Sequence, residues 1–400
     1  MKTLALSFRY LWARPLAAAL NLLLLSLGLA SITLVLLVSE QIDRAFDRDL
    51  AGIDLVVGAK GSPIQLILAG VFHIDVPPGN IALAEVQALQ QDPRVAKLIP
   101  LSLGDSFRGF RLVGTTADYV HHYGATVAQG GLWRAPMQTV LGAGVASATG
   151  LKAGASFVGS HGLGGGGHAH GDDAFVVSGV LAPCQCVLDR LILTATESVW
   201  QVHEKAQAQD DADRAVMQAE REVTMALIQY RSPLAAVTLP RYVNSATGMQ
   251  AAAPAVEVTR LLRMMGVGTD VLRGFGAVLL LTAGLSVFIA LWNAVRERRF
   301  DLAMLRMLGA SPGKLAGLLV CEALWLALLA SALGLLGGHL LTALVGWMLQ
   351  AEKSLPVSGW LVVGAEAWIV LVALAVAVLA ALIPAAGAYR VDAGELLNTR

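Results

Sequence analysis

The side chains best suited to direct chemistry in this sequence gather on one glycine-rich stretch, residues 161–173. The stretch reads HGLGGGGHAHGDD, and its candidate metal ligands are His161, His168, His170, Asp172 and Asp173. Imidazole and carboxylate groups are common zinc ligands, and histidine-rich tracts often bind divalent metals. The glycines leave these groups without a fixed geometry. Two interpretations therefore stay open: a site for zinc or another divalent metal, and a solvated loop that binds nothing.

The three cysteines are too few for a disulfide framework. Cys184 and Cys186 have one residue between them, and a bridge that short is expected to be strained. Free thiols and soft metal ligands are both open interpretations for this pair. Cys321 lies in an apolar stretch, which is typical of a packing residue.

The sequence contains no recognisable catalytic or nucleotide-binding motif. Residues 57–62, VGAKGS, lack the glycine and lysine spacing of a phosphate-binding loop. The glycine tract at 162–167 is not placed between a strand and a helix, as a dinucleotide fingerprint would be. No clustered acid, base or nucleophile stands out. We therefore predict that the protein is not an enzyme and has no intrinsic cofactor.

Composition indicates a membrane protein with a substantial soluble part. Of 400 residues, 56% are hydrophobic and 14% are charged, against about 25% charged in soluble domains. The formal net charge is zero, which argues against nucleic acid as a partner. About 20 apolar residues cross a bilayer. Four stretches are long enough: 16–38, 275–295, 315–349 and 360–388.

The basic residues predict which ends of these spans face the cytoplasm. They cluster before the first span, between the second and third, and in the tail, at Lys2, Arg9, Arg14, Arg296, Arg298, Arg299, Arg306, Lys314, Arg390 and Arg400. Both termini are therefore expected in the cytoplasm of a bacterium, with the chain in its inner membrane. The first apolar run is too long for a cleaved signal peptide, and we interpret it as a retained anchor.

The spans divide the chain into three predicted parts. Residues 1–39 form an amphipathic helix and the first span, residues 40–273 an extracytoplasmic domain, and residues 274–400 three more spans. Within the domain, β-forming runs predict strands at 54–57, 111–114, 139–141, 175–181 and 191–194. Helices are expected at 83–91 and, as one long arm, at 197–229. The fold class is therefore an α-helical membrane protein of four transmembrane helices with an inserted mixed α/β domain.

A polar loop between the second and third spans has the pattern of a short amphipathic helix. Phe300, Ala303, Met304 and Met307 recur at helical spacing. Gly309 is expected to end the helix, and Ser311 and Pro312 suit the start of the next. Such a helix could anchor the topology, lie on lipid, or dock a cytoplasmic partner.

The sequence of this loop resembles the FtsX/MacB-type permeases, also called type VII ABC permeases. The family pattern has an acidic-basic run, then Leu-Arg-x-Leu-Gly-Ala-Ser, a Glu in the next span, and spaced glycines. Here these are Glu297 and Arg299, residues 305–311, Glu322, and the glycines Gly334, Gly337 and Gly338. The ending with Pro384, Ala385, Ala388, Asp392 and 395–397 also matches. Arg299-Phe300-Asp301 departs from the family, where a second Glu is commoner.

The resemblance implies that ATP is bound and hydrolysed by a separate ATPase subunit. That subunit would dock on the coupling loop, 296–312, through Glu297, Arg298, Arg299, Leu305, Arg306 and Gly309. The resemblance also implies an external domain of two lobes that move with the ATPase cycle. Glu322 lies inside the third span, and a structural ion pair with Arg14, Arg299 or Arg306 is favoured over a proton relay.

The favoured function is the permease subunit of an ABC transporter, which moves or extracts a substrate at the outer side of the membrane. The histidine loop favours a metal-linked cargo. Alternatives are lipoprotein release or amphiphile export of the macrolide type, and a non-transporting signalling scaffold that controls a cell-wall hydrolase. Expected partners are the ATPase, membrane lipid and a second permease copy, identical or paralogous. A periplasmic accessory or substrate-binding protein is a further alternative.

Overall fold

The computed structural model describes residues 2–13, 15–162, 169–207, 210–297, 299–351 and 357–389. The chain forms two compact units, one of Met1–Ile42 with Met265–Arg400 and one of Asp43–Met264. We call them the helical unit and the inserted unit and describe each by itself.

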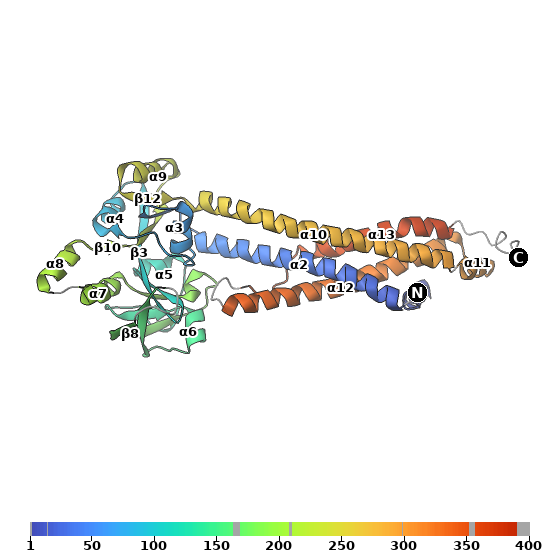
Figure 1. The fold of residues 1–400 in the computed structure, drawn as a ribbon, viewed down its shortest axis with the longest axis horizontal. Coiled ribbons are helices and arrows are strands. Elements are labelled where there is room, and N and C mark those ends of the chain that lie inside the picture. Colours follow the sequence, from blue (N-terminus) through green and yellow to red (C-terminus); the bar gives the residue numbers. More distant parts are fainter. Residues whose placement is uncertain are drawn as a thin grey trace. The chain divides into compact units, whose positions relative to one another are not determined.

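The described part of the helical unit contains six helices, several of which are very long (Figure 1). They are α1 (Lys2–Leu11), α2 (Pro15–Leu50), α10 (Pro254–Glu297), α11 (Arg299–Met307), α12 (Pro312–Ala351) and α13 (Glu366–Tyr389), of which α2 and α10 extend into the inserted unit. Within the described residues, four segments are long and apolar enough to cross a membrane: Pro15–Leu50, Gly274–Glu297, Pro312–Met348 and Glu366–Tyr389. The four predicted spans are thereby confirmed, although the fourth begins at Glu366 and not near Trp360.

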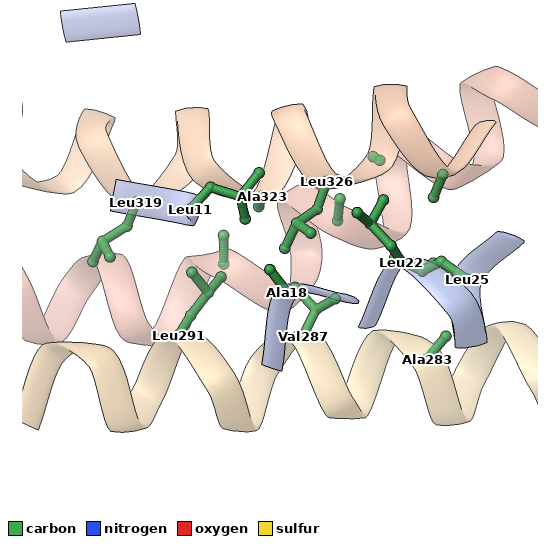
Figure 2. Packing of buried hydrophobic residues seen from close by; sticks show 14 of the residues in the cluster. Leu11, Ala18, Leu22, Leu25, Ala283, Val287, Leu291, Leu319, Ala323 and Leu326 are labelled. Atoms are coloured by element: carbon green, nitrogen blue, oxygen red, sulfur yellow. The ribbon is translucent and has the colours of Figure 1, made fainter. Parts of the chain in front are cut away.

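Small and branched apolar side chains hold the spans together. Figure 2 shows residues from α1, α2, α10 and α12 that meet in one buried cluster, among them Leu22, Leu25, Val287, Leu291 and Leu326. Helix α13 adds alanines at every fourth position, Ala373, Ala377 and Ala381, all of them buried. A stripe of alanines lets neighbouring helices approach closely, which is how helices associate inside a bilayer.

Glycines of the third span lie where α12 packs closely on α2, and α12 does not break there. A Cβ atom at Gly334 would lie 2.6 Å from the Leu29 Cβ, and one at Gly338 would lie 2.4 Å from the Thr33 Cβ. Backbone-to-backbone packing of α12 on α2 therefore requires glycine at both positions. Helix α12 continues without interruption over 40 residues, about 60 Å.

Polar side chains also join the spans. Ser286 of α10 donates a hydrogen bond to Asn21 of α2. His339 of α12 contacts the Gly359 carbonyl at 2.7 Å and the Glu366 carboxylate of α13 at 3.2 Å. These contacts bury polar groups in pairs, as the low dielectric of a membrane requires.

The inserted unit contains a ten-stranded mixed sheet with helices packed on it, which confirms the predicted α/β class. The strand order is β12-β1-β11-β3-β4-β9-β6-β8-β5, and β7 pairs with β3 and β8. The strands are β1 (Leu55–Ala59), β3 (Val95–Phe107), β4 (Phe110–Thr115), β5 (Val127–Gly130), β6 (Gln138–Leu141), β7 (Ser156–His161), β8 (Ala169–Leu181), β9 (Leu191–Ala195), β11 (Met225–Tyr230) and β12 (Met249–Ala252). A small second sheet pairs β2 (Ile81–Ala82) with β10 (Glu222–Val223).

The helices of the inserted unit are short. They are α3 (Pro63–Gly70), α4 (Leu83–Gln90), α5 (Ala117–His122), α6 (Ala143–Thr149), the 3-10 helix η1 (Val187–Arg190), α7 (Thr196–Gln207), α8 (Asp211–Ala219) and α9 (Ala235–Ala246). All five predicted strands and the helix predicted at 83–91 correspond to observed elements.

Strand β3 serves two hydrophobic cores. Its first half pairs with β11 and its second half with β4. One core contains Leu55, Val86 and Leu239, and the other contains Leu112 and Phe175. The unit therefore has two hydrophobic centres on either side of one long shared strand.

The predicted helical arm at 197–229 is wrong. The segment forms two helices, α7 and α8, followed by strands β10 and β11. Asp210 begins α8 by accepting a hydrogen bond from the Asp213 amide at 2.8 Å. Residues 225–228 are buried between β1 and β3, and pairing on both sides stabilises the strand over a helix.

Cys184 and Cys186 form a disulfide, so the predictions of free thiols or metal ligands are wrong for this structure. The bridge lies beside a buried polar cluster at the end of α2. Arg190 contacts the Asp49 carboxylate at 3.1 Å, and Tyr123 donates a hydrogen bond to the Asp49 carbonyl at 2.7 Å.

Candidate functional site

Helix α11 and the turn that follows it form the best-defined functional candidate in the helical unit. The turn ends α11 with two backbone hydrogen bonds, from the Gly309 amide to the Arg306 carbonyl and from the Ala310 amide to the Leu305 carbonyl, each 3.0 Å. This pair of bonds is a Schellman cap, and it needs a left-handed residue, which Gly309 supplies with a φ of 91°. Pro312 then begins α12, so the predicted stop and restart are confirmed.

The two faces of α11 differ in what they contact. Leu302 and Ala303 are 4% and 5% exposed, and Leu302 belongs to the buried cluster of the spans, against which Leu305 also packs. The opposite face carries Phe300, Met304, Met307 and Leu308, which are 58%, 44%, 56% and 81% exposed. We call these four residues the α11 ridge. Helix α11 is thus fixed to the spans by one apolar face, and its second apolar face is exposed on the surface of the helical unit.

The sequence prediction misassigned one residue of this helix and missed another. Ala303 was grouped with Phe300, Met304 and Met307, but it lies on the buried face. Leu308, absent from that set, is the most exposed residue of the α11 ridge. The spacing i, i+4, i+7 and i+8 from Phe300 places Leu308 on the same face as the other three residues, although it does not tell whether that face is exposed.

Helix α1 packs on α12. The rings of Phe8 and Trp325 meet edge to face at 5.3 Å between centroids, and the Trp325 indole donates to the Leu4 carbonyl at 3.3 Å. The hydroxyl of Ser7 is buried and donates to the same carbonyl at 2.9 Å. The N-terminal helix is therefore fixed to the third span by a defined contact.

An apolar cavity of about 350 Å³ opens among three spans of the helical unit. Helix α2 lines it with Leu29, Ile32, Val35 and Leu36. Leu280 of α10 and Trp368, Ile369 and Val372 of α13 complete the lining together with Ala365. No side chain in this lining can ionise, so the cavity suits an apolar group.

Family models match nearly the whole chain. A MacB-like periplasmic core domain matches residues 18–261, and an FtsX-like permease C-terminal region matches residues 273–393. The first match alone covers more than half of the sequence. The chain belongs to the FtsX/MacB-like family of ABC transporter permeases. It is a transmembrane subunit of a transporter whose ATPase activity resides in a partner subunit.

Two solved structures are similar to part of the permease. One is the periplasmic region of MacB from Actinobacillus actinomycetemcomitans, at 12% identity over 53% of this chain and 95% of that one, with a TM-score of 0.35. The other is the extracellular domain of the noncanonic ABC-type transporter YknZ from Gram-positive bacteria, at 12% identity over 50% and 98%, with a TM-score of 0.30. No curated protein matches the permease.

The coupling residues predicted from the sequence fall in and around α11. Leu305 and Arg306 are half-buried, and Glu297 and Gly309 are exposed. Arg298 lies outside the described residues, as does the side chain of Arg299. Glu322 is 4% exposed within α12, beside the span cluster. Its predicted ion pair stays a prediction.

The predicted metal loop is mostly outside the described residues. His168 is not described, and neither are the side chains of His161, His170, Asp172 and Asp173. The backbone shows that His161 ends β7 and that residues 169–173 belong to the paired strand β8. Within the part of the chain that the structure describes, no cluster of three or more His, Cys, Asp or Glu could hold a metal ion.

Proposed function

We propose that this permease transmits the ATP-driven motion of its partner subunit to the inserted unit, and that the partner docks on the α11 ridge. The observation that supports this proposal is that one apolar face of α11 is buried while the other is exposed. Leu302 lies in the buried cluster of the spans and Leu305 packs against it, so a force applied to the exposed ridge acts on the spans. Exposed aromatic and methionine side chains are enriched at protein interfaces.

The orientation of the chain is part of the proposal. The excess of basic residues in the N-terminal flank, the α10–α12 loop and the tail favours a cytoplasmic location for α11 and both termini. The inserted unit then lies outside, in the compartment where the substrate is moved. The four spans of one chain are few for a transport pathway, so we propose two permease copies in the complete transporter.

A helix that lies on lipid is the main alternative for α11. Such a helix buries one apolar face in the bilayer and exposes a polar face to water. Helix α11 instead has Leu302 in the span cluster, Leu305 packed against that cluster, and the four apolar residues of the α11 ridge on the other side. This second apolar face favours a protein partner.

Cross-linking tests the docking proposal directly. In a Cys321→Ser background, Met307→Cys should cross-link to the ATPase subunit through a cysteine-to-amine reagent, because Met307 is 56% exposed on the ridge. Leu340→Cys is the matched control, since Leu340 is 62% exposed but lies in the third span. Equal cross-linking yields from the two positions would contradict docking at α11.

We propose two candidate cargoes, of which the first is a metal-linked substrate. Three histidines and two aspartates in residues 161–173 favour a metal-linked substrate on chemical grounds. Full-length permease should bind zinc with micromolar or tighter affinity, and deletion of residues 162–171 should weaken that binding at least tenfold while the inserted unit stays folded. Isothermal titration of the two proteins measures this difference. Equal zinc affinity of the wild type and the deletion variant would contradict a metal-linked substrate that binds through residues 162–171.

The apolar cavity favours a second candidate cargo, an amphiphile with an acyl chain. Its lining from α2, α10 and α13 is wholly apolar, and about 350 Å³ accommodates part of such a chain. Lipoprotein release and amphiphile export both involve molecules of this kind. Zinc-independent stimulation of ATP hydrolysis by an acylated peptide would favour this cargo over the metal-linked one.

A further inference from the structure

The disulfide of the inserted unit closes an unusually small ring. Cys184 and Cys186 are bridged with one residue between them. The stabilisation that a cross-link gives by restricting the unfolded chain grows with the number of residues it encloses. This bridge encloses a single residue, so it restricts the unfolded chain very little and does not connect distant parts of the fold.

The bridged residues instead belong to a short segment that contacts the end of α2. We call residues 184–190 the cysteine loop. The Val187 amide donates to the Asp49 carboxylate at 2.8 Å, and Arg190 contacts the same carboxylate at 3.1 Å. Arg48 donates to the Gln185 side chain at 2.9 Å. Both partners of the Asp49 carboxylate therefore come from the cysteine loop. The Asp49 side chain is only 2% exposed, so these contacts are made in a site that is largely protected from water.

The loop is held in a conformation that its sequence does not favour. Gln185, between the two cysteines, has a φ of 56°, in the left-handed region that residues other than glycine seldom adopt. Asp189 fixes the backbone there by accepting the Cys184 amide at 3.0 Å and the Gln185 amide at 2.7 Å. Opening the bridge removes one of the constraints on this residue, and a left-handed glutamine then tends to relax.

The surroundings of the two sulfur atoms also suit the reduced form. The Cys184 Sγ lies 3.4 Å from the Asp189 Oδ1. A bridged sulfur carries no hydrogen, but a thiol at this position could donate to the carboxylate. Cys184 is half-buried, whereas Cys186 is 9% exposed, so an incoming thiolate reaches the sulfur of Cys184 more easily.

We propose that the Cys184–Cys186 bridge is a redox-active site that exchanges with an external dithiol, and that its reduction loosens the cysteine loop from Asp49. The dithiol's thiolate attacks the Cys184 Sγ, the Sγ–Sγ bond breaks, and Cys186 leaves as a thiolate that takes up a proton. The second thiol of the dithiol then resolves the mixed disulfide and releases Cys184 as a thiol. Two electrons and two protons pass from the dithiol to the bridge.

The experiment uses the full-length permease in lipid nanodiscs with dithiothreitol as the dithiol. Alkylation and mass spectrometry should show that the bridge is reduced while the protein is native. Hydrogen exchange of the peptide that contains Val187 should then become at least tenfold faster, with exchange in β9 unchanged. A bridge that is reduced only after denaturation, or reduction without faster exchange at Val187, would overturn the proposal.

Two variants separate the bridge from general effects of the reagent. Cys184→Ser with Cys186→Ser should match the reduced protein in the exchange of the Val187 peptide without dithiothreitol. Cys321→Ser removes the remaining cysteine and should respond to dithiothreitol as the wild type does. A double variant that exchanges like the oxidised wild type would count against the proposal, and if that variant does not fold, the Cys321→Ser protein decides the question alone.

Discussion

Met304→Glu combined with Leu308→Glu should reduce permease-dependent stimulation of ATP hydrolysis at least tenfold. Both residues belong to the α11 ridge and are 44% and 81% exposed, so the substitutions leave the permease's own packing intact. In the assembled transporter, each carboxylate would be buried against an apolar partner surface without a counter-charge. Burial of an unpaired charge is among the costliest changes an interface can suffer.

The measurement is the ATPase rate of the reconstituted complex as a function of permease concentration. Met304→Leu with Leu308→Met keeps the apolar character and should retain coupling, which makes it the matched control. The charged variant should still insert into membranes and purify as a monodisperse protein. Undiminished stimulation by that variant would place the docking surface elsewhere.

Gly338→Val should destabilise the helical unit by about 1–3 kcal/mol, the usual cost of forcing extra volume into a packed interface. A Cβ at Gly338 would meet Thr33 Cβ at 2.4 Å and the Ala30 carbonyl oxygen at 3.1 Å, and Thr33 is fully buried. The contact involves backbone as well as side chain, so a rotamer change cannot relieve it. Helix α12 would have to move away from α2.

Gly317 provides the control within the same helix, because a Cβ there would meet no atom within 4 Å. Gly317→Val should therefore lower the thermal stability of the detergent-solubilised permease far less than Gly338→Val does. Equal thermal shifts for the two variants would show that the cost comes from helix propensity and not from packing against α2.

The features predicted correctly from the sequence are those encoded locally. The spans follow from uninterrupted apolar runs, and the end of α11 follows from Gly309 and Pro312, which restrict the backbone wherever they occur. The apolar run predicts a fourth span from residue 360, which is six residues before α13 begins. The Glu366 carboxylate accepts the Val363 amide at 2.7 Å, and the helix begins only there.

The errors concern features that depend on distant parts of the chain. The helical arm predicted at 197–229 includes the residues of β11, but β11 is stabilised by partners about 125 and 170 residues away in β3 and β1. The exposed face of α11 could not be fixed from spacing alone, since both of its faces are apolar. Which face is buried depends on the spans that α11 packs against; Leu302 belongs to the same buried cluster as Leu315 and Leu319 of the third span.

The most direct test of the proposed transmission is hydrogen exchange across Asp43–Met264 in the full complex, compared between ATP-bound and ADP-bound states. We expect nucleotide-dependent exchange in the inserted unit of the wild type, and its loss in the Met304→Glu, Leu308→Glu protein. Identical exchange in both states, measured while the wild-type complex hydrolyses ATP, would contradict the transmission of motion from the partner to this unit.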